Sequence, residues 1–164
     1  MEPMNNLVKE YTEQLRKGRI QKAYKGIMAF MSGLKNFMGN RYPGHHSGVL
    51  YSGYMDMTYF AFTPLELKKN NLKIAVVYLH EQNRFEAWLG GGNRKVQAEY
   101  IERMRHMDIG GYQLSRINPG VDSIIELRIT EQPDFDRAED LMREIGSRTI
   151  EFTKNILSVL ANDE

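Results

Sequence analysis

The residues with the clearest potential for chemistry form the glycine-rich stretch GGGNRK, at positions 90–95. A glycine-rich turn between a strand and a helix exposes backbone N–H groups at the positive end of the helix, where an anion can bind. Arg94 and Lys95 add positive charge, and Asn93 is a residue type favoured at helix N-caps. The spacing matches neither G-x-x-x-x-G-K-[ST] nor G-x-G-x-x-G, so no nucleotide motif is present. The stretch predicts an anion site, and the alternative is a simple capped turn.

Two further side chains extend this candidate site. Glu86 and Trp88 point to the same side of the preceding strand, because side chains alternate along a strand. Gln97 follows about one helical turn after the glycines. A tryptophan beside a carboxylate can line a pocket for a base, a sugar or a cation, whereas the alternative places Trp88 in the core and Glu86 in an edge ion pair. The predicted ligand-binding residues are Glu86, Trp88, Asn93, Arg94, Lys95 and Gln97.

Other kinds of chemistry find little support in the sequence. The chain has no cysteine, which excludes disulfides, cysteine-ligated zinc and thiol catalysis. His45 and His46 are adjacent in a polar loop, but two neighbouring imidazoles rarely bind one metal ion well. Neither H-E-x-x-H nor G-x-S-x-G occurs. We therefore predict no catalytic residue, no metal site and no cofactor.

Composition sets the broad class. The length of 164 residues predicts one domain, residues 1–164, and the apolar and charged fractions are those of a folded protein. The net charge of +1 argues against a dedicated nucleic-acid binder. The polar N-terminus lacks the apolar core of a signal peptide, and no stretch of about 18 apolar residues exists. We expect a cytoplasmic protein without a membrane partner; protein partners and homo-oligomers stay open.

Hydrophobic periodicity indicates the elements that position the candidate site. Helical spacing marks residues 4–15 and 20–38, and Gly26 and Gly33 in the second helix suggest close packing against another element. Strands are expected at residues 49–63, 72–79, 84–90 and 121–130, with a tight turn at 80–83. Residues 72–79 are apolar on both faces, which is typical of a strand covered on both sides. Helices follow the glycines and end the chain.

The resulting order is helix, helix, three or four strands, helix, strand, helix. Strands joined by short turns favour antiparallel pairing, with the helices packed on the sheet. The predicted fold class is therefore α+β, with a largely antiparallel sheet of four to five strands flanked by helices.

Parts of the sequence resemble a family of small bacterial proteins of uncharacterised function. The resemblance rests on FEAWLGGGNRKVQ at positions 85–97, preceded by LKIAVVYLH at positions 72–80, and on VDSIIE at 121–126 and PDFD at 133–136. It implies a bacterial, cytoplasmic protein, and it implies no activity or site.

Two functions remain as hypotheses. The first is a non-catalytic ligand-binding or regulatory domain, with a pocket for a small anionic or polar ligand at the turn between Gly90 and Asn93. The second is a divergent enzyme with a fold similar to the restriction endonucleases, which hold Mg²⁺ with an acidic residue and an E-x-K motif. Here Glu86 is followed by Trp88 where the lysine is expected, and Asp56 lies on a different predicted strand.

Overall fold

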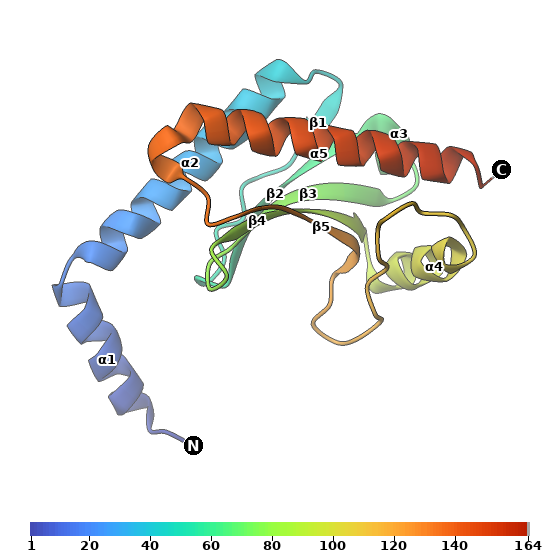
Figure 1. Cartoon of the computed structure of the whole chain (residues 1–164). Helices are drawn as coiled ribbons and strands as arrows, with labels where there is room; N and C mark the ends of the chain where they lie inside the picture. Colours follow the sequence, from blue (N-terminus) through green and yellow to red (C-terminus); the bar gives the residue numbers. More distant parts are fainter. Residues whose placement is uncertain (164) are drawn as a thin grey trace.

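A five-stranded antiparallel sheet organises the chain (Figure 1). A computed structural model describes residues 1–163. Each strand pairs antiparallel with the next strand of the sequence, in the order β1-β2-β3-β4-β5. The predicted α+β class, with a largely antiparallel sheet flanked by helices, is confirmed. The elements are α1 (Met4–Arg16), α2 (Arg19–Arg41), β1 (His45–Ser47), β2 (Met57–Pro64), α3 (Leu65–Lys68), β3 (Leu72–Leu79), β4 (Arg84–Gly91), α4 (Arg94–Arg105), β5 (Ser123–Glu131), the 3-10 helix η1 (Phe135–Arg137) and α5 (Ala138–Ala161).

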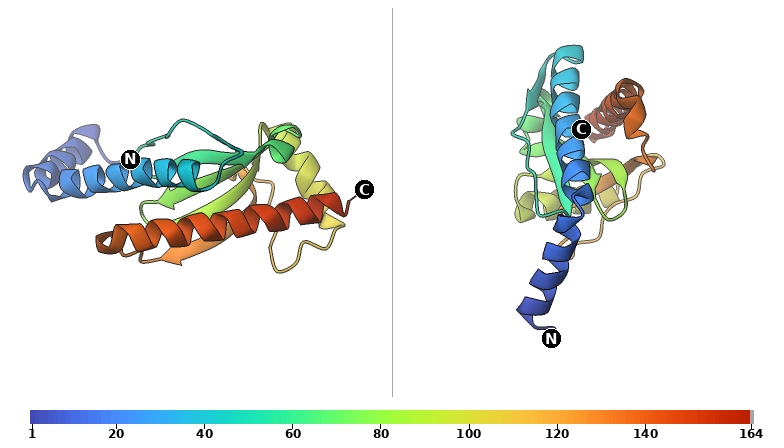
Figure 2. Two further views of the ribbon diagram at one scale, coloured as in Figure 1. Left: turned by 90° about the horizontal axis from the view of Figure 1, so that it is seen from above. Right: turned by 90° about the vertical axis from the view of Figure 1, so that its left-hand side faces the viewer.

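The two faces of the sheet are covered differently. The helices α2 and α5 lie over one face (Figures 1 and 2), where Ile74, Val76 and Phe85 join the buried core. Within residues 1–163, no helix lies over the middle of the opposite face, although α4 packs against β4 and β5 at one end. Ala75 and Val77 on this open face are nevertheless buried. Their small side chains are covered by larger neighbouring side chains. The strand is therefore covered on both faces, as predicted, but on the second face by side chains and not by helices.

The β3–β4 hairpin fixes the register of the open face. Asn83 adopts a left-handed backbone conformation in its turn (φ 50°), which asparagine tolerates better than most residues. The hydroxyl of Tyr78 donates to Asn83 Oδ1 at 2.7 Å and closes the turn. The predicted hairpin is confirmed, and its register pairs Lys73 with Gly90 and Ala75 with Trp88.

The segment before β3 differs from the prediction. The strand predicted at residues 49–63 begins only at Met57. A turn precedes it, in which Gly53 has φ +72° and an added Cβ would lie 2.0 Å from the carbonyl oxygen of Met57. The polar loop predicted around His45 and His46 contains a short edge strand, β1, which pairs with β2, and the imidazole of His45 stacks on Phe62 with ring centroids 4.5 Å apart. Local sequence did not reveal this long-range contact.

The first two helices also differ in detail. Helix α2 continues past residue 38, where the predicted helix ends, to Arg41. Helix α1 has the predicted apolar stripe, but it buries no residue, and Met4, Leu7 and Tyr11 are exposed. Figures 1 and 2 show α1 projecting away from the sheet. Among the helices of residues 1–163, none is both long and apolar enough to span a membrane.

Candidate functional site

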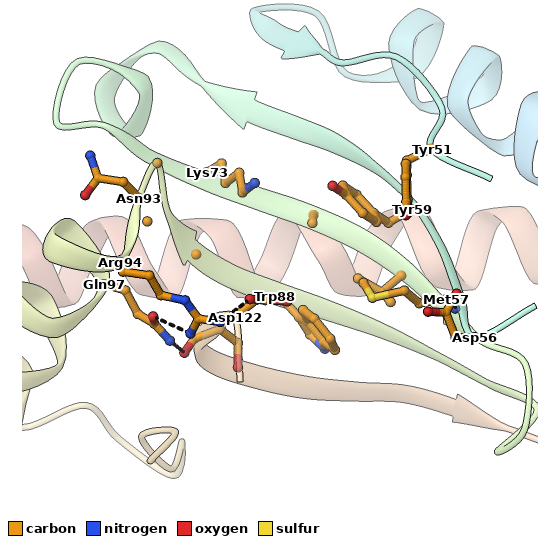
Figure 3. Close-up of a pocket in the computed structure, with 16 residues that line it drawn as sticks. Tyr51, Asp56, Met57, Tyr59, Lys73, Trp88, Asn93, Arg94, Gln97 and Asp122 are labelled. Atoms are coloured by element: carbon orange, nitrogen blue, oxygen red, sulfur yellow. Dashed lines mark hydrogen bonds and ion pairs between the residues drawn. The ribbon is translucent and has the colours of Figure 1, made fainter. Parts of the chain in front are cut away.

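The open face of the sheet contains a cavity of about 500 Å³ beside the glycine turn (Figure 3). This volume lies within the range of small-molecule sites. Strands β2, β3 and β4, the turn before α4 and the start of β5 all contribute to its wall. The lining residues are Tyr51, Asp56, Met57, Tyr59, Lys73, Ala75, Val77, Trp88, Gly90, Gly91, Gly92, Asn93, Arg94, Gln97, Asp122 and Ser123.

Small side chains create the floor of this cavity. Ala75 and Val77 of β3 lie between β2 and β4, and Gly90 faces Lys73 across the β3–β4 ladder. A Cβ added at Gly90 would lie 3.5 Å from Lys73 Cε, which is an ordinary van der Waals contact. A side chain at Gly90 would therefore occupy space that glycine leaves open. The cavity therefore depends on residue size along two neighbouring strands.

The glycine turn is required for close packing. A Cβ on Gly91 would lie 2.7 Å from the backbone nitrogen of Gln97, and one on Gly92 would lie 2.0 Å from Asn71 Oδ1. Neither glycine has a positive φ, so the need is for space and not for an unusual conformation. Asn93 caps α4, since its Oδ1 accepts a hydrogen bond from Val96 N at 2.9 Å. The predicted N-cap is confirmed.

Arg94 and Gln97 connect the start of α4 to the start of β5. The guanidinium of Arg94 donates to Asp122 Oδ1 at 2.8 Å and to Gln97 Oε1 at 3.1 Å. It also donates to the carbonyl of Val121. The amide of Gln97, which is buried, donates to the carbonyls of Val121 and Ser123 at 2.8 and 3.0 Å. Arg94 thus has a structural role whatever it binds, and its charge is largely balanced by Asp122.

Glu86 and Trp88 share one face of β4, as predicted, but only Trp88 lines the cavity. Glu86 is 2% exposed, and its two carboxylate oxygens accept hydrogen bonds from Trp88 Nε1 at 2.7 Å and Arg84 Nε at 2.6 Å. The carboxylate therefore orients the indole ring and lies outside the cavity wall. Lys95 is exposed on α4 and does not line the cavity either. Of the six predicted residues, the cavity brings together Trp88, Asn93, Arg94 and Gln97.

Lys73, Tyr59 and Asp56 are among the lining residues that the sequence did not indicate as part of this site. Lys73 of β3 extends toward Tyr59 of β2, and its Nζ lies 5.9 Å from the ring centroid (Figure 3). Lys73 forms no ion pair with any residue in the described range 1–163. Asp56 lines the end of the cavity next to Met57. One signal could have indicated Lys73, because it is the only charged residue in the apolar strand LKIAVVYL.

Two carboxyl groups near the cavity have shifted pKa values. Hydrogen bonds from the backbone amides of Tyr54 and Met57, at 2.9 and 2.7 Å, hold the pKa of Asp56 below its usual value. Desolvation, followed by the nearby carboxylate of Glu86, raises the pKa of Glu126, while a hydrogen bond from Ser123 opposes this rise. The lowered pKa favours the ionised form of Asp56, which lines the cavity together with Asp122. Within residues 1–163, no three histidine, aspartate or glutamate side chains gather as a metal site.

Comparison with known proteins gives one match. A family model described as Domain of unknown function (DUF7000) matches residues 4–160, a range that contains every residue of the cavity wall. No curated protein and no solved structure matches the chain. The family description carries no activity, so the geometry of the cavity must carry the functional argument.

Proposed function

The chain belongs to the family described as Domain of unknown function (DUF7000), and we propose that it binds a small polar or anionic ligand without catalysing its conversion. The binding site is the cavity on the open face of the sheet, beside the turn between Gly90 and Asn93. In this proposal the protein is a regulatory or ligand-carrying domain of the bacterial cytoplasm.

The side chain of Lys73 is the observation that carries the proposal. It is half-buried in a mainly apolar strand, and no acidic residue among those described neutralises it. A partly desolvated charge without a counter-ion is unfavourable, and an anionic ligand would remove that cost. The Tyr59 ring compensates only in part, since a cation–π contact contributes about 0.5–1 kcal/mol at exposed sites. The cavity around Lys73 is large enough for such a ligand.

Two carboxylates at or beside the cavity, Asp122 and Glu86, are held by structural partners, which favours a binding role for this part of the site. Asp122 is paired with Arg94, and Glu86 is held by Arg84 and Trp88. A general base needs a free lone pair within reach of a substrate proton, and these two carboxylates are already engaged. The endonuclease hypothesis depends on Glu86 as a metal ligand, and this buried, hydrogen-bonded carboxylate gives it no support.

A binding experiment can use the only tryptophan of the chain as its probe. Trp88 lines the cavity, so its fluorescence reports directly on occupancy. The panel would contain inorganic phosphate, sugar phosphates, nucleotides, dicarboxylates and amino acids, with thermal unfolding measured in parallel. A ligand at 100 times its Kd stabilises the fold by about 2.7 kcal/mol, which raises Tm by about 5–10 °C for a chain of this size.

The matched variants are Lys73→Met and Lys95→Ala. Each removes one positive charge near the glycine turn, but only Lys73 lines the cavity. We expect Lys73→Met to weaken binding at least tenfold and Lys95→Ala to leave it unchanged. Equal effects of the two substitutions would indicate nonspecific attraction to a basic surface. If no compound in the panel changed the Trp88 fluorescence or the Tm, the proposed function would be contradicted.

A further inference from the structure

The cavity has two chemically different ends, and we infer that its ligand is a planar aromatic ring with an amino group at one end and an anionic group at the other. A nucleoside monophosphate with an amino-substituted base has this chemistry, and so does an amino-substituted aromatic carboxylate. The inference rests on the proposed function, because it specifies the ligand of the same cavity.

The basic end lies at the glycine turn. Lys73 supplies a cation without an ion pair among residues 1–163, and the adjacent N-terminus of α4 adds the partial positive charge of a helix end. Gly90, opposite Lys73 in the register, leaves room beside the ammonium group. Arg94 contributes less, because Asp122 already balances its charge. This end is suited to a phosphate or carboxylate group, with Lys73 as its main partner.

The middle of the cavity is flat and aromatic. Tyr59 on β2 and Trp88 on β4 flank the low floor formed by Ala75 and Val77 of the intervening strand β3. Tyr51 extends this wall, with its ring centroid 5.1 Å from that of Tyr59. The two outer strands are separated by twice the spacing of neighbouring strands, about 9–10 Å. A planar ring lying on this floor would contact aromatic side chains on both sides.

The far end of the cavity is acidic. Asp56 uses Oδ1 to accept both backbone hydrogen bonds of its turn, from Tyr54 N and Met57 N. Its Oδ2 accepts no hydrogen bond from the described residues and is free for a ligand donor. An ionised carboxylate repels an anionic group and accepts hydrogen bonds from an amino group. The charges therefore orient the ligand, with its anion toward Lys73 and its ring amino group toward Asp56.

The length of the cavity favours an extended ligand over a bare anion. Leu79, which pairs with Met57 beside Asp56, lies six positions after Lys73 along β3. This separation is about 20 Å along the strand, and the side chain of Lys73 extends toward Tyr59 and shortens it. Inorganic phosphate could occupy only the basic end. A ring joined to an anionic group through a sugar could reach from one end to the other.

The decisive experiment compares whole ligands with their parts. Fluorescence of Trp88, excited at the red edge of the indole band where purines do not absorb, would be titrated with AMP, IMP, adenosine, ribose 5-phosphate, inorganic phosphate and 4-aminobenzoate. Calorimetry would confirm each Kd. We expect AMP to bind at least tenfold more tightly than adenosine, ribose 5-phosphate or phosphate, and more tightly than IMP, which has a carbonyl in place of the amino group.

Two variants connect the two ends of the cavity to parts of the ligand, and a third variant fills the cavity. Lys73→Met should weaken the binding of AMP at least tenfold and the binding of adenosine less than threefold. Asp56→Asn keeps the Oδ1 acceptor of the turn and should abolish the preference for AMP over IMP. Gly90→Val fills the cavity and should weaken the binding of every ligand. The circular dichroism and Tm of this variant should stay close to those of the natural protein.

The outcomes separate the ligand class from the proposed function. If 4-aminobenzoate bound more tightly than AMP, the inference of a ring with an anionic group would be supported, and the ligand would be an aromatic acid and not a nucleotide. If ribose 5-phosphate bound as tightly as AMP, the ring would be excluded while ligand binding remained. If all six probes failed, the inferred class would be overturned. Binding of a dicarboxylate or an amino acid from the wider panel would then still support the proposed function. If none of these compounds bound, both the inferred ligand class and the proposed function would be contradicted.

Discussion

At the scale of single residues, the buried carboxylate of Glu86 holds the aromatic wall of the cavity in place. It accepts hydrogen bonds from Trp88 Nε1 and from Arg84 Nε, so both carboxylate oxygens have a donor. Its side chain is 3% exposed, and that of Arg84 is 17% exposed. In such a position, loss of the negative charge leaves donors without a strong acceptor. The orientation of the indole ring therefore depends on a residue outside the cavity.

We predict that Glu86→Gln lowers the free energy of unfolding by about 1–3 kcal/mol, the usual cost of a poorly satisfied buried polar group. The tryptophan emission should also shift, because Trp88 loses its charged acceptor. Urea unfolding and the emission spectrum measure the two effects. Glu131→Gln is the matched control, since Glu131 lies 3.7 Å from Arg84 but is 61% exposed, and it should change stability by less than about 0.5 kcal/mol. Equal losses in both variants would contradict the structural role of Glu86.

A second residue-scale prediction concerns pH. Burial lowers the pKa of His80 below its usual 6.5, and the nearby charge of Asp56 opposes this only in part. Thr58 Oγ1 donates its proton to the carbonyl of Ser52 and lies 2.8 Å from His80 Nε2, so Nε2 carries a proton and donates to it. The unfolded chain therefore binds more protons than the folded chain between the lowered pKa and 6.5. Stability should fall as the pH decreases through this window.

Chemical unfolding at a series of pH values would measure this slope, with His80→Gln as the comparison. The variant should lack the decrease below pH 6.5, whereas the natural protein should show it. Asp56 does not affect this comparison near pH 6.5. Its pKa is lowered from 3.8, so its contribution to the free energy of unfolding is lost only below that pH. Parallel slopes for the two proteins would show that His80 titrates alike in the folded and unfolded chains.

The sequence brings together only those residues of the candidate site that are close along the chain. Trp88, Asn93, Arg94 and Gln97 belong to one strand, turn and helix, so spacing along the chain places them together. Lys73 reaches the same cavity only through the register of β3 with β4. Tyr59 and Asp56 depend on where β2 begins, and the sequence placed that start too early. Local periodicity does not determine strand register, and about half of the cavity wall depends on that register.

At the scale of elements, the two glycines inside α2 have different surroundings. The sequence suggests close packing at both Gly26 and Gly33, and this holds only for Gly33, where an added Cβ would lie 2.9 Å from Met142 Cε of α5. At Gly26 nothing lies within 4 Å of an added Cβ. Tertiary position therefore decides which glycine serves the packing of α2 on α5, and the helical pattern alone cannot distinguish them.

We predict that Gly26→Ala stabilises the protein by about 0.5–1 kcal/mol, because alanine has the higher helix propensity and the site is open. Gly33→Ala should gain less or nothing, since the Met142 side chain must move to admit the Cβ. Thermal and urea unfolding of the two single variants would test this difference within one helix. A larger gain at Gly33 than at Gly26 would show that α2 and α5 are not in close contact at this point.

At the scale of the whole molecule, the fold divides into a well-packed body and a projecting N-terminal helix. Strand β3 lies at the centre of the sheet, and most of its residues are buried. Helix α1 buries none of its residues and joins α2 at Gly18, which has φ +74°. The sequence predicted both elements correctly as strand and helix. It could not predict which apolar stripe lies against the sheet, because a helical pattern specifies an apolar face and not its partner.

Hydrogen exchange would make this division measurable. Backbone amides of β3 and β4 should open only with global unfolding and exchange most slowly, because both strands are paired on both sides. Amides of α1 should exchange fastest among the helices of eight or more residues, since isolated helices of this length are marginal in water. Removal of residues 1–16 should then change the free energy of unfolding of the remaining body by less than about 1 kcal/mol, since surface changes are usually small. Strong protection of α1 that increased with protein concentration would contradict this picture, because it would require a contact between copies of the chain.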